Sequence, residues 1–180
     1  LERLFLLSET RGREAAGLAL HLGPSIPVYK RPLPASEMIS TQAYREFLDL
    51  ALASGPSSER SKTSGFCAIG HSRMMTNGAQ GVNSNNQPVI KDGIVGVHNG
   101  IICNVDRLWA NNPELKRSYE VDTEVLLSLV RQTLATGDSV QEAVRATYCK
   151  IEGSASVALL FEDQRKLVLA TNTGSLFLGH

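Results

Sequence analysis

The sequence predicts an α+β domain in which antiparallel sheets lie beneath layers of helices. Apolar runs of strand length and amphipathic runs of helical length are partly grouped along the chain rather than strictly alternating. The glycine patterns of phosphate loops and of dinucleotide-binding folds are both absent. A length of 180 residues with 42% hydrophobic residues suits one domain with a real core. These observations disfavour a doubly wound parallel sheet.

The first half of the chain is predicted to contain two helices and two strands. Leucines and Phe5 share one face of an N-terminal helix, which Gly12 can end as a C-terminal cap. Four prolines indicate a surface connection before the second helix, which Ser40 or Thr41 can cap. The expected elements are a helix over 1–9, a strand over 17–22, a connection over 24–34, a helix over 40–53, a mobile loop over 54–64 and a strand over 66–71.

The second half is predicted to contain one strand, two helices and a hairpin. The pair Asn99-Gly100 is typical of a tight turn, and it directly follows an apolar strand. Asp122 before a run of apolar positions is a helix N-terminus signature, and Gly153 ends the last helix. The expected elements are a strand over 94–97, helices over 123–135 and 139–151, and strands over 157–161 and 167–170 joined by a hairpin over 162–166.

The charge balance and the cysteines exclude several classes of protein. Eighteen basic residues match eighteen acidic residues, so neither nucleic acid nor a membrane surface is expected as a partner. No apolar run reaches the roughly 18 residues that span a bilayer. Cys67, Cys103 and Cys149 form no CxxC pair and no disulfide framework, which favours a cytoplasmic protein without structural zinc. No metal or cofactor is expected.

Both ends of the chain resemble cuts within a longer protein. The sequence opens at Leu1 inside an amphipathic pattern and closes inside the apolar stretch 176–178. A natural domain rarely stops in a strand that would leave a sheet edge unpaired. We therefore expect residues 1–180 to be a domain truncated at both ends.

Two polar, glycine-containing segments follow predicted strands, at residues 71–78 and 98–104. Side chains at strand ends are common components of binding sites, because a rigid sheet holds them in place. Taken singly, each residue has a simpler interpretation: Arg73 as a solvated charge, Asn99-Gly100 as a turn and Asp122 as a helix cap. No single residue among these supports a function.

Taken together and in order, the segments resemble class II glutamine amidotransferases over nearly the whole chain. The overall pattern is most similar to the glutaminase domains of glutamine–fructose-6-phosphate amidotransferases, and amidophosphoribosyltransferases share much of it. The resemblance implies an Ntn-hydrolase-like fold, a four-layer αββα sandwich of two antiparallel sheets between helical layers. The segments that carry it are 11–17 (Arg-Gly-x-Glu-x-x-Gly), 71–78 (His-x-Arg-x-x-Thr-x-Gly), 86–88 (Asn-Gln-Pro), 98–104 (His-Asn-Gly-x-Ile-x-Asn), 122–125 (Asp-Thr-Glu-Val) and 153–155 (Gly-Ser-Ala).

The resemblance implies a site for one glutamine molecule. Arg73 suits the α-carboxylate, since a guanidinium is always charged and can bind in bidentate fashion. Asp122, assisted by Gly100, suits the α-ammonium, and Thr76 and Gly78 belong to the same binding loop as Arg73. The Asn99 side chain and the Gly100 backbone N–H are implied to form the oxyanion hole.

The resemblance also implies that the nucleophile is an N-terminal cysteine, which is absent from this chain because Leu1 stands at its start. The expected activity is hydrolysis of glutamine to glutamate and ammonia, with transfer to an acceptor by a synthase or isomerase domain in a homo-oligomer. A catalytically inactive glutamine-binding or scaffolding domain is the alternative. An Ntn hydrolase with another nucleophile fits Arg73 and Asp122 less well. Met74 and Asn77 depart from the tryptophan and histidine of sugar-specific members, which leaves the acceptor open.

Overall fold

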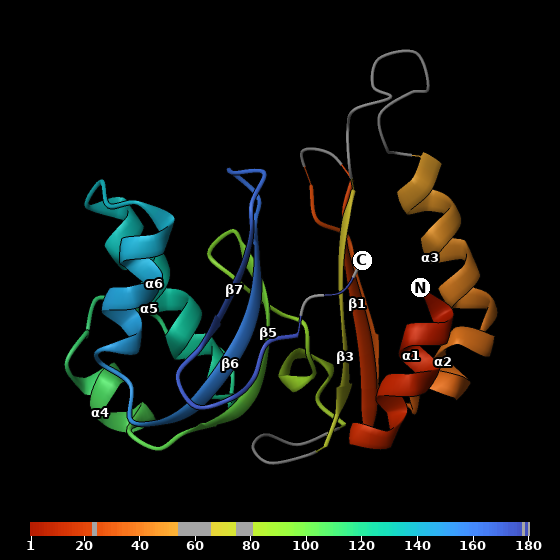
Figure 1. Cartoon of the computed structure of the whole chain (residues 1–180), viewed down its shortest axis with the longest axis horizontal. Helices are drawn as coiled ribbons and strands as arrows, with labels where there is room; N and C mark the ends of the chain where they lie inside the picture. The colour runs from red at the N-terminus through yellow and green to blue at the C-terminus, as the bar shows by residue number, and fades with distance from the viewer. Residues whose placement is uncertain (23–24, 54–65, 75–80, 178, 180) are drawn as a thin grey trace.

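The structure is a computed structural model that describes residues 1–22, 25–53, 66–74, 81–177 and 179. Two antiparallel sheets lie face to face, and helices cover the outer face of each sheet (Figure 1). The α+β class and the four αββα layers predicted from the sequence are therefore confirmed. Among the described residues, no helix is long and apolar enough to cross a membrane.

The first sheet has three strands in the order β2-β1-β3. Strand β1 (Ala15–His21) is central, between β2 (Val28–Arg31) and β3 (Cys67–Arg73). All seven residues of β1 are buried, because the helices α1, α2 and α3 cover one face of the sheet and the second sheet covers the other. The covering elements are α1 (Glu2–Ser8) with the short η1 (Glu9–Arg11), α2 (Ala35–Ser40) and α3 (Gln42–Ala53).

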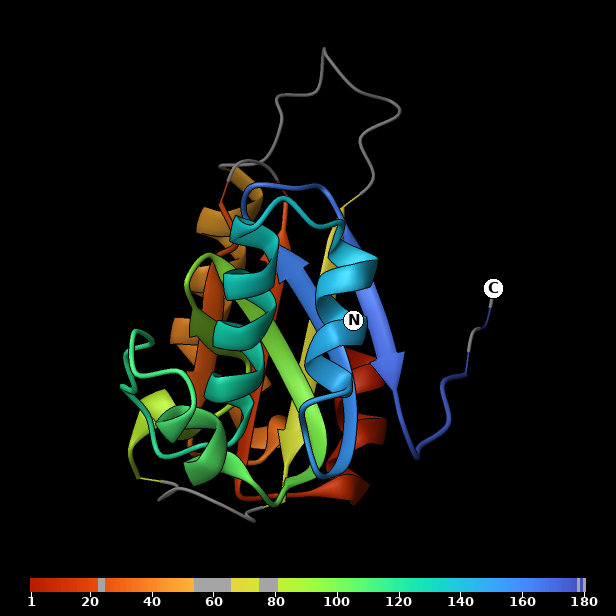
Figure 2. The ribbon, with the colours of Figure 1, turned by 90° about the vertical axis from the view of Figure 1, so that its left-hand side faces the viewer.

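The second sheet has four strands in the order β4-β5-β6-β7. Figure 2 shows α5 and α6 lying across its outer face. Helix α6 begins at a capping box, in which Ser139 and Glu142 satisfy each other's backbone N–H groups. The elements are η2 (Asn83–Asn85), β4 (Val89–Lys91), β5 (Ile94–Ile102), α4 (Val105–Ala110), α5 (Thr123–Ala135), α6 (Val140–Tyr148), β6 (Gly153–Phe161) and β7 (Leu167–Thr171).

Three apolar clusters hold the layers together. One lies between the first sheet and its helices, and the largest lies between the second sheet and α4 to α6. The third joins the two sheets, where Ala19 and Ile69 meet Val95 and Leu160. Burial of these side chains stabilises the sandwich by about 25 cal/mol per Å² of apolar surface. The two sheets are thereby held in a fixed position relative to each other, so that loops at their ends can meet.

Several elements differ from the sequence prediction. The proline-rich stretch predicted as a connection contains β2. The helix predicted over 40–53 is confirmed as α3, which begins at Gln42, and the separate helix α2 before it was not predicted. The strand β4 and the helix α4 were not predicted. The predicted loop over 54–64 lies outside the described residues. The hairpin between β6 and β7 is confirmed, as are the helices after Asp122 and Ser139.

The predicted tight turn at Asn99-Gly100 is wrong. Both residues lie inside β5, where they pair with Ser156 and Ala155 of β6. The local signal for a turn is overridden by pairing with a strand more than fifty residues further along the chain. Gly100 still needs to be glycine: its φ is +135°, and a Cβ atom would lie 2.1 Å from the carbonyl oxygen of Ser154.

Candidate glutamine site

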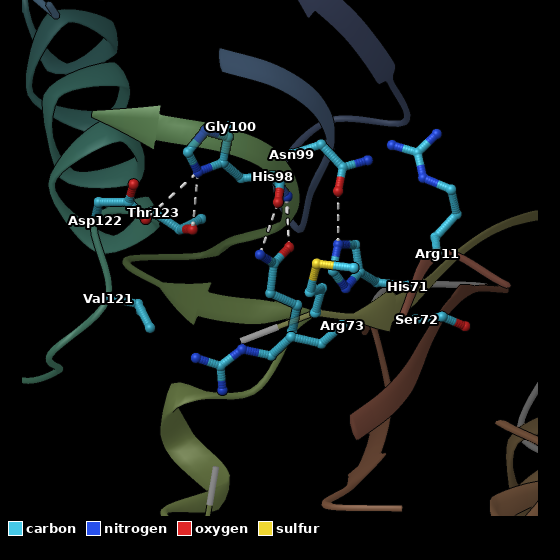
Figure 3. A pocket seen from close by; sticks show the side chains of 12 residues that line it. Arg11, His71, Ser72, Arg73, His98, Asn99, Gly100, Val121, Asp122 and Thr123 are labelled. Carbon is cyan, nitrogen blue, oxygen red and sulfur yellow. Dashed lines mark hydrogen bonds and ion pairs between the residues drawn. The ribbon is translucent and has the colours of Figure 1, made fainter. Parts of the chain in front are cut away.

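A cavity of about 240 Å³ lies where the end of β3, the second half of β5 and the start of α5 meet (Figure 3). It brings Arg73, Asn99, Gly100 and Asp122 together, as the sequence predicted. Thr76 and Gly78 lie outside the described residues. The lining residues are Arg11, His71, Ser72, Arg73, Met74, Gln87, His98, Asn99, Gly100, Val121, Asp122 and Thr123.

Arg73 is a buried cation in the cavity wall, not a solvated surface charge. Its side chain is only 4% exposed, and its Nη1 donates to Oδ1 of Asn86 at 2.6 Å. Burial lowers the pKa of Arg73 from its ordinary value, and the negative charges of Asp122 and Glu14 oppose that shift. A guanidinium is always charged and presents five N–H donors in a planar fork. The site therefore carries a positive charge suited to a carboxylate.

Lys30 on β2 fixes the segment that positions Arg73. Its Nζ donates to the carbonyl oxygens of Asn86 at 2.6 Å, Pro88 at 2.9 Å and Ser84 at 3.3 Å. Burial lowers the pKa of Lys30 to about 8, and the charge of Arg73 contributes to the shift. The loop that bears Asn86 is therefore anchored to the first sheet.

Gln87, the next residue of this loop, connects it to the second sheet. Its Nε2 donates to the carbonyl oxygen of His98 at 2.8 Å, and its Oε1 accepts from the His98 N–H at 2.5 Å. Residues 86–88 thus link the guanidinium of Arg73 to the backbone of β5. This bridging role of residues 86–88 was not predicted from the sequence, in which they contribute only to the family resemblance.

Asp122 supplies the negative charge of the cavity. It stands at the start of α5, but its side chain makes no helix-capping hydrogen bond. Instead its Oδ2 accepts from the Ile102 N–H at 2.9 Å, and its Oδ1 lies 3.5 Å from Nδ1 of His98. Burial raises the pKa of Asp122, but the hydrogen bonds from His98 and Ile102 lower it by more, so the net pKa lies below its ordinary value. The carboxyl group is therefore anionic at neutral pH.

The next two residues of the Asp-Thr-Glu run hold this corner of the cavity in place. Thr123 Oγ1 lies 3.3 Å from Nδ1 of His98. Glu124 is fully buried, forms a 2.9 Å ion pair with Lys91, and accepts the backbone N–H groups of Ser118 and Tyr119 at 2.7 Å. The pattern therefore combines one cavity-lining carboxylate with a structural hydroxyl and a structural carboxylate. Only the first of these was predicted from the sequence.

Asn99 and Gly100 are exposed, and both line the cavity. The Oδ1 atom of Asn99 lies 3.0 Å from Nε2 of His71, a buried histidine of β3 (Figure 3). None of the three cysteines of the sequence lines the cavity. Among the described residues, no group of three or more His, Cys, Asp or Glu side chains is arranged to hold a metal ion.

Gly17 of β1 lies against residues 86–88, the bridging segment, and we expect Gly17→Ala to destabilise the fold. A Cβ atom there would lie 2.1 Å from the carbonyl oxygen of Gln87 and 2.7 Å from Cδ of Pro88. Overpacking of this kind costs about 2 kcal/mol, which should lower the Tm of a domain of this size by roughly 4–8 °C. Thermal unfolding followed by circular dichroism measures the shift.

Gly81→Ala is the matched control, because a Cβ atom at Gly81 meets nothing within 4 Å. Its Tm should stay within about 2 °C of the parent value, in line with surface substitutions. Equal Tm values for the two variants would show that Gly17 and the bridging segment do not pack as closely as described.

Known proteins share both the sequence pattern and the fold. Residues 71–179 match the glutamine amidotransferase domain family. The glutamine–fructose-6-phosphate aminotransferase (isomerizing) of Rhizobium meliloti is 36% identical over 121 residues, which are 65% of this chain and 20% of that protein. The enzyme of the same name from Caulobacter vibrioides is 32% identical over 169 residues, or 93% of this chain and 25% of that protein.

The solved structure of glutamine phosphoribosylpyrophosphate amidotransferase from B. subtilis superposes with a TM-score of 0.67 at 23% identity, covering 94% of this chain and 33% of that one. This likeness supports the fold. The chain spans about a fifth to a quarter of the length of the curated relatives it matches. Because the family match covers more than half of the chain and includes Arg73, Asn99, Gly100 and Asp122, the chain belongs to the glutamine amidotransferase domain family.

Proposed function

We propose that this domain binds glutamine in the cavity and hydrolyses its side-chain amide to glutamate and ammonia. The observation that carries the proposal is a buried cation, Arg73, and a buried anion, Asp122, on the walls of one small cavity. A free α-amino acid carries both complementary charges. The charge pair therefore favours an amino acid over a neutral or singly charged substrate, and the family match favours glutamine among amino acids.

Glutamine is oriented by its two charged groups in this proposal. The α-carboxylate binds the guanidinium of Arg73, and the α-ammonium binds the carboxylate of Asp122. The side-chain amide then extends toward Asn99 and Gly100. Thr76 and Gly78 are proposed to complete the binding loop around the α-carboxylate. The fixed positions of Arg73 and Asp122 reduce the entropy that is lost when the substrate is ordered.

The proposed nucleophile is an N-terminal cysteine that lies outside these 180 residues. Its thiolate attacks the amide carbon and gives a tetrahedral oxyanion, which the Asn99 NH₂ and the Gly100 N–H stabilise. The C–N bond breaks, and ammonia leaves with a proton delivered by the cysteine's α-ammonium group. Water then attacks the thioester, releasing glutamate and the thiol. The absence of all three cysteines of this sequence from the cavity supports a nucleophile from elsewhere.

The ammonia is proposed to pass to a synthase or isomerase domain in the same or a partner chain, within a homo-oligomer. The names of the relatives point to fructose 6-phosphate as one candidate acceptor. Met74 and Asn77 differ from the residues typical of sugar-specific members, so the acceptor is left open. The three free thiols support a cytoplasmic location.

An inactive glutamine-binding or scaffolding domain is the second candidate, favoured by the same lack of a thiol in the cavity. The two proposals differ in one measurement. Glutamate release from glutamine by the full-length protein supports the enzyme. Saturable glutamine binding without glutamate release supports the binding domain.

Asn99→Ala in the full-length protein is expected to lower kcat for glutamate release by roughly a hundredfold, with little change in the KM for glutamine. Loss of one oxyanion donor costs about 2.7–4 kcal/mol in the transition state and little in the ground state. Steady-state kinetics with a coupled glutamate assay gives both constants.

The matched control is Asn111→Ala, since Asn111 is an exposed asparagine at the end of α4 and does not line the cavity. Its kinetic constants should equal those of the parent. An unchanged kcat for Asn99→Ala would refute the oxyanion assignment, whereas a raised KM alone would place Asn99 in ground-state binding.

A further inference from the structure

His71 is a buried histidine in the cavity wall that the proposed chemistry does not use. It is 8% exposed, and its backbone is fixed in β3 by pairing with Gly17 of β1. Its Nε2 lies 3.0 Å from Oδ1 of Asn99, which belongs to β5 of the facing sheet. The hydrogen bond therefore crosses between the two sheets at the cavity (Figure 3).

The bond matters because an asparagine amide can point in two directions. Rotation of the amide by half a turn exchanges Oδ1 and Nδ2, and only one orientation presents N–H donors to an oxyanion. The other presents an oxygen, which would repel the developing negative charge. A donor placed against Oδ1 selects the productive orientation. In Figure 3 the amide nitrogen of Asn99 is turned away from the His71 ring.

The ring of His71 supplies such a donor. Burial lowers its pKa to about 4 against the opposing effect of the Asn99 hydrogen bond, and the charges of His98, Arg73 and Arg11 lower it further, so the ring is neutral at pH 7. Nδ1 of His71 is buried without a hydrogen-bond partner in the described part of the chain. A proton on Nδ1 would leave that donor unpaired and would set the Nε2 lone pair against Oδ1. The single proton therefore belongs on Nε2.

We propose that His71 is a positioning residue: its Nε2–H holds the side-chain amide of Asn99 with the NH₂ group directed at the oxyanion. The inference rests on the proposed glutaminase function, because it assigns the residue that orients one half of the oxyanion hole. His71 itself does not touch the substrate in this role. Its effect should therefore depend entirely on the presence of the Asn99 side chain.

The test is a double-mutant cycle in the full-length protein, measured as glutamate release. His71→Leu should lower kcat about tenfold and leave the KM for glutamine within about twofold, because orientation of a transition-state donor is lost. His71→Gln, whose amide N–H₂ can reach the Nε2 position, should restore most of the activity. His71→Asn keeps the polarity but is too short to reach Oδ1, so it should resemble His71→Leu.

The decisive measurement adds His71→Leu to the Asn99→Ala variant. No further loss of kcat is expected, since the amide that His71 orients is already absent. Calorimetric titration with the product glutamate should give the parent affinity for every His71 variant. His21→Leu is the matched control: His21 is a buried histidine of β1 that does not line the cavity, and its substitution should leave kcat unchanged.

Three outcomes would overturn the proposal. One is an equal loss of kcat from His71→Leu with and without the Asn99 side chain, which would indicate a general structural role. Another is full activity in both His71→Leu and His71→Asn while Asn99→Ala remains impaired. The third is an unchanged kcat in Asn99→Ala itself, which would refute the proposed oxyanion hole together with this inference. The first two leave the proposed function intact.

Discussion

Asp122→Asn in the full-length protein should raise the KM for glutamine by about a hundred- to a thousandfold, with a much smaller effect on kcat. The carboxylate is buried, and its hydrogen bonds hold its pKa below the ordinary value, so an anion stands where the proposed function places the α-ammonium. Loss of one partner of a buried, hydrogen-bonded charge pair costs about 2–5 kcal/mol. Asparagine retains an oxygen that can accept the Ile102 N–H, so the local backbone should be preserved.

A glutamine analogue that lacks the α-amino group distinguishes a role of Asp122 in binding the ammonium from a role in the structure of the site. The parent protein should bind glutamine far more tightly than this analogue, because only glutamine carries the ammonium. Asp122→Asn should bind the two compounds with similar affinity in calorimetric titrations. Asp106→Asn is the control, since Asp106 is exposed on α4 and pairs with Arg117 at the surface. If Asp122→Asn still prefers glutamine strongly, Asp122 does not bind the ammonium and its role is structural.

Three residues of the candidate site could be predicted to lie together because their chemical groups are scarce in the sequence and their order is specific. Arg73, Asn99 and Asp122 are each ordinary in isolation, and only their sequence order indicated a shared ligand. The structure places all three on one cavity. Burial excludes the interpretation of Arg73 as a solvated surface charge, and burial depends on how two sheets face each other. A sequence read one segment at a time does not contain that information.

The supporting residues could not be predicted for a related reason. Gln87 binds the backbone of a strand eleven residues away, and His71 meets Asn99 only because β3 and β5 belong to facing sheets. Asn99-Gly100 has the composition of a turn, but pairing with β6 makes it part of a strand. In each case a contact between distant segments overrides or adds to the local preference. The spacing of the motifs indicated where the site lies. The hydrogen bonds within the site could be identified only from the three-dimensional structure.

Glu124→Gln should lower the free energy of unfolding by about 4 kcal/mol, because it breaks a buried ion pair and leaves one charge behind. Glu124 is 0% exposed, and its carboxylate lies 2.9 Å from Nζ of Lys91. The Nζ group also donates to two neutral acceptors, the carbonyl oxygen of Lys116 at 2.6 Å and the hydroxyl of Ser118 at 3.4 Å. A neutral amide cannot balance the ammonium. It also presents an NH₂ group to the backbone N–H groups that the carboxylate oxygens now accept.

Urea unfolding followed by the fluorescence of Trp109, the one tryptophan of the sequence, measures the effect. The exposed pair between Arg107 and Glu152 supplies the control: Glu152→Gln should cost less than about 1 kcal/mol, because water screens that pair. Adding Lys91→Met to Glu124→Gln should recover part of the lost stability, since no unpaired ammonium then remains. A double variant as unstable as Glu124→Gln alone would show that the carboxylate acts only through the backbone groups of the loop before Asp122. In that case Lys91 does not help to hold the carboxylate of Asp122 in place.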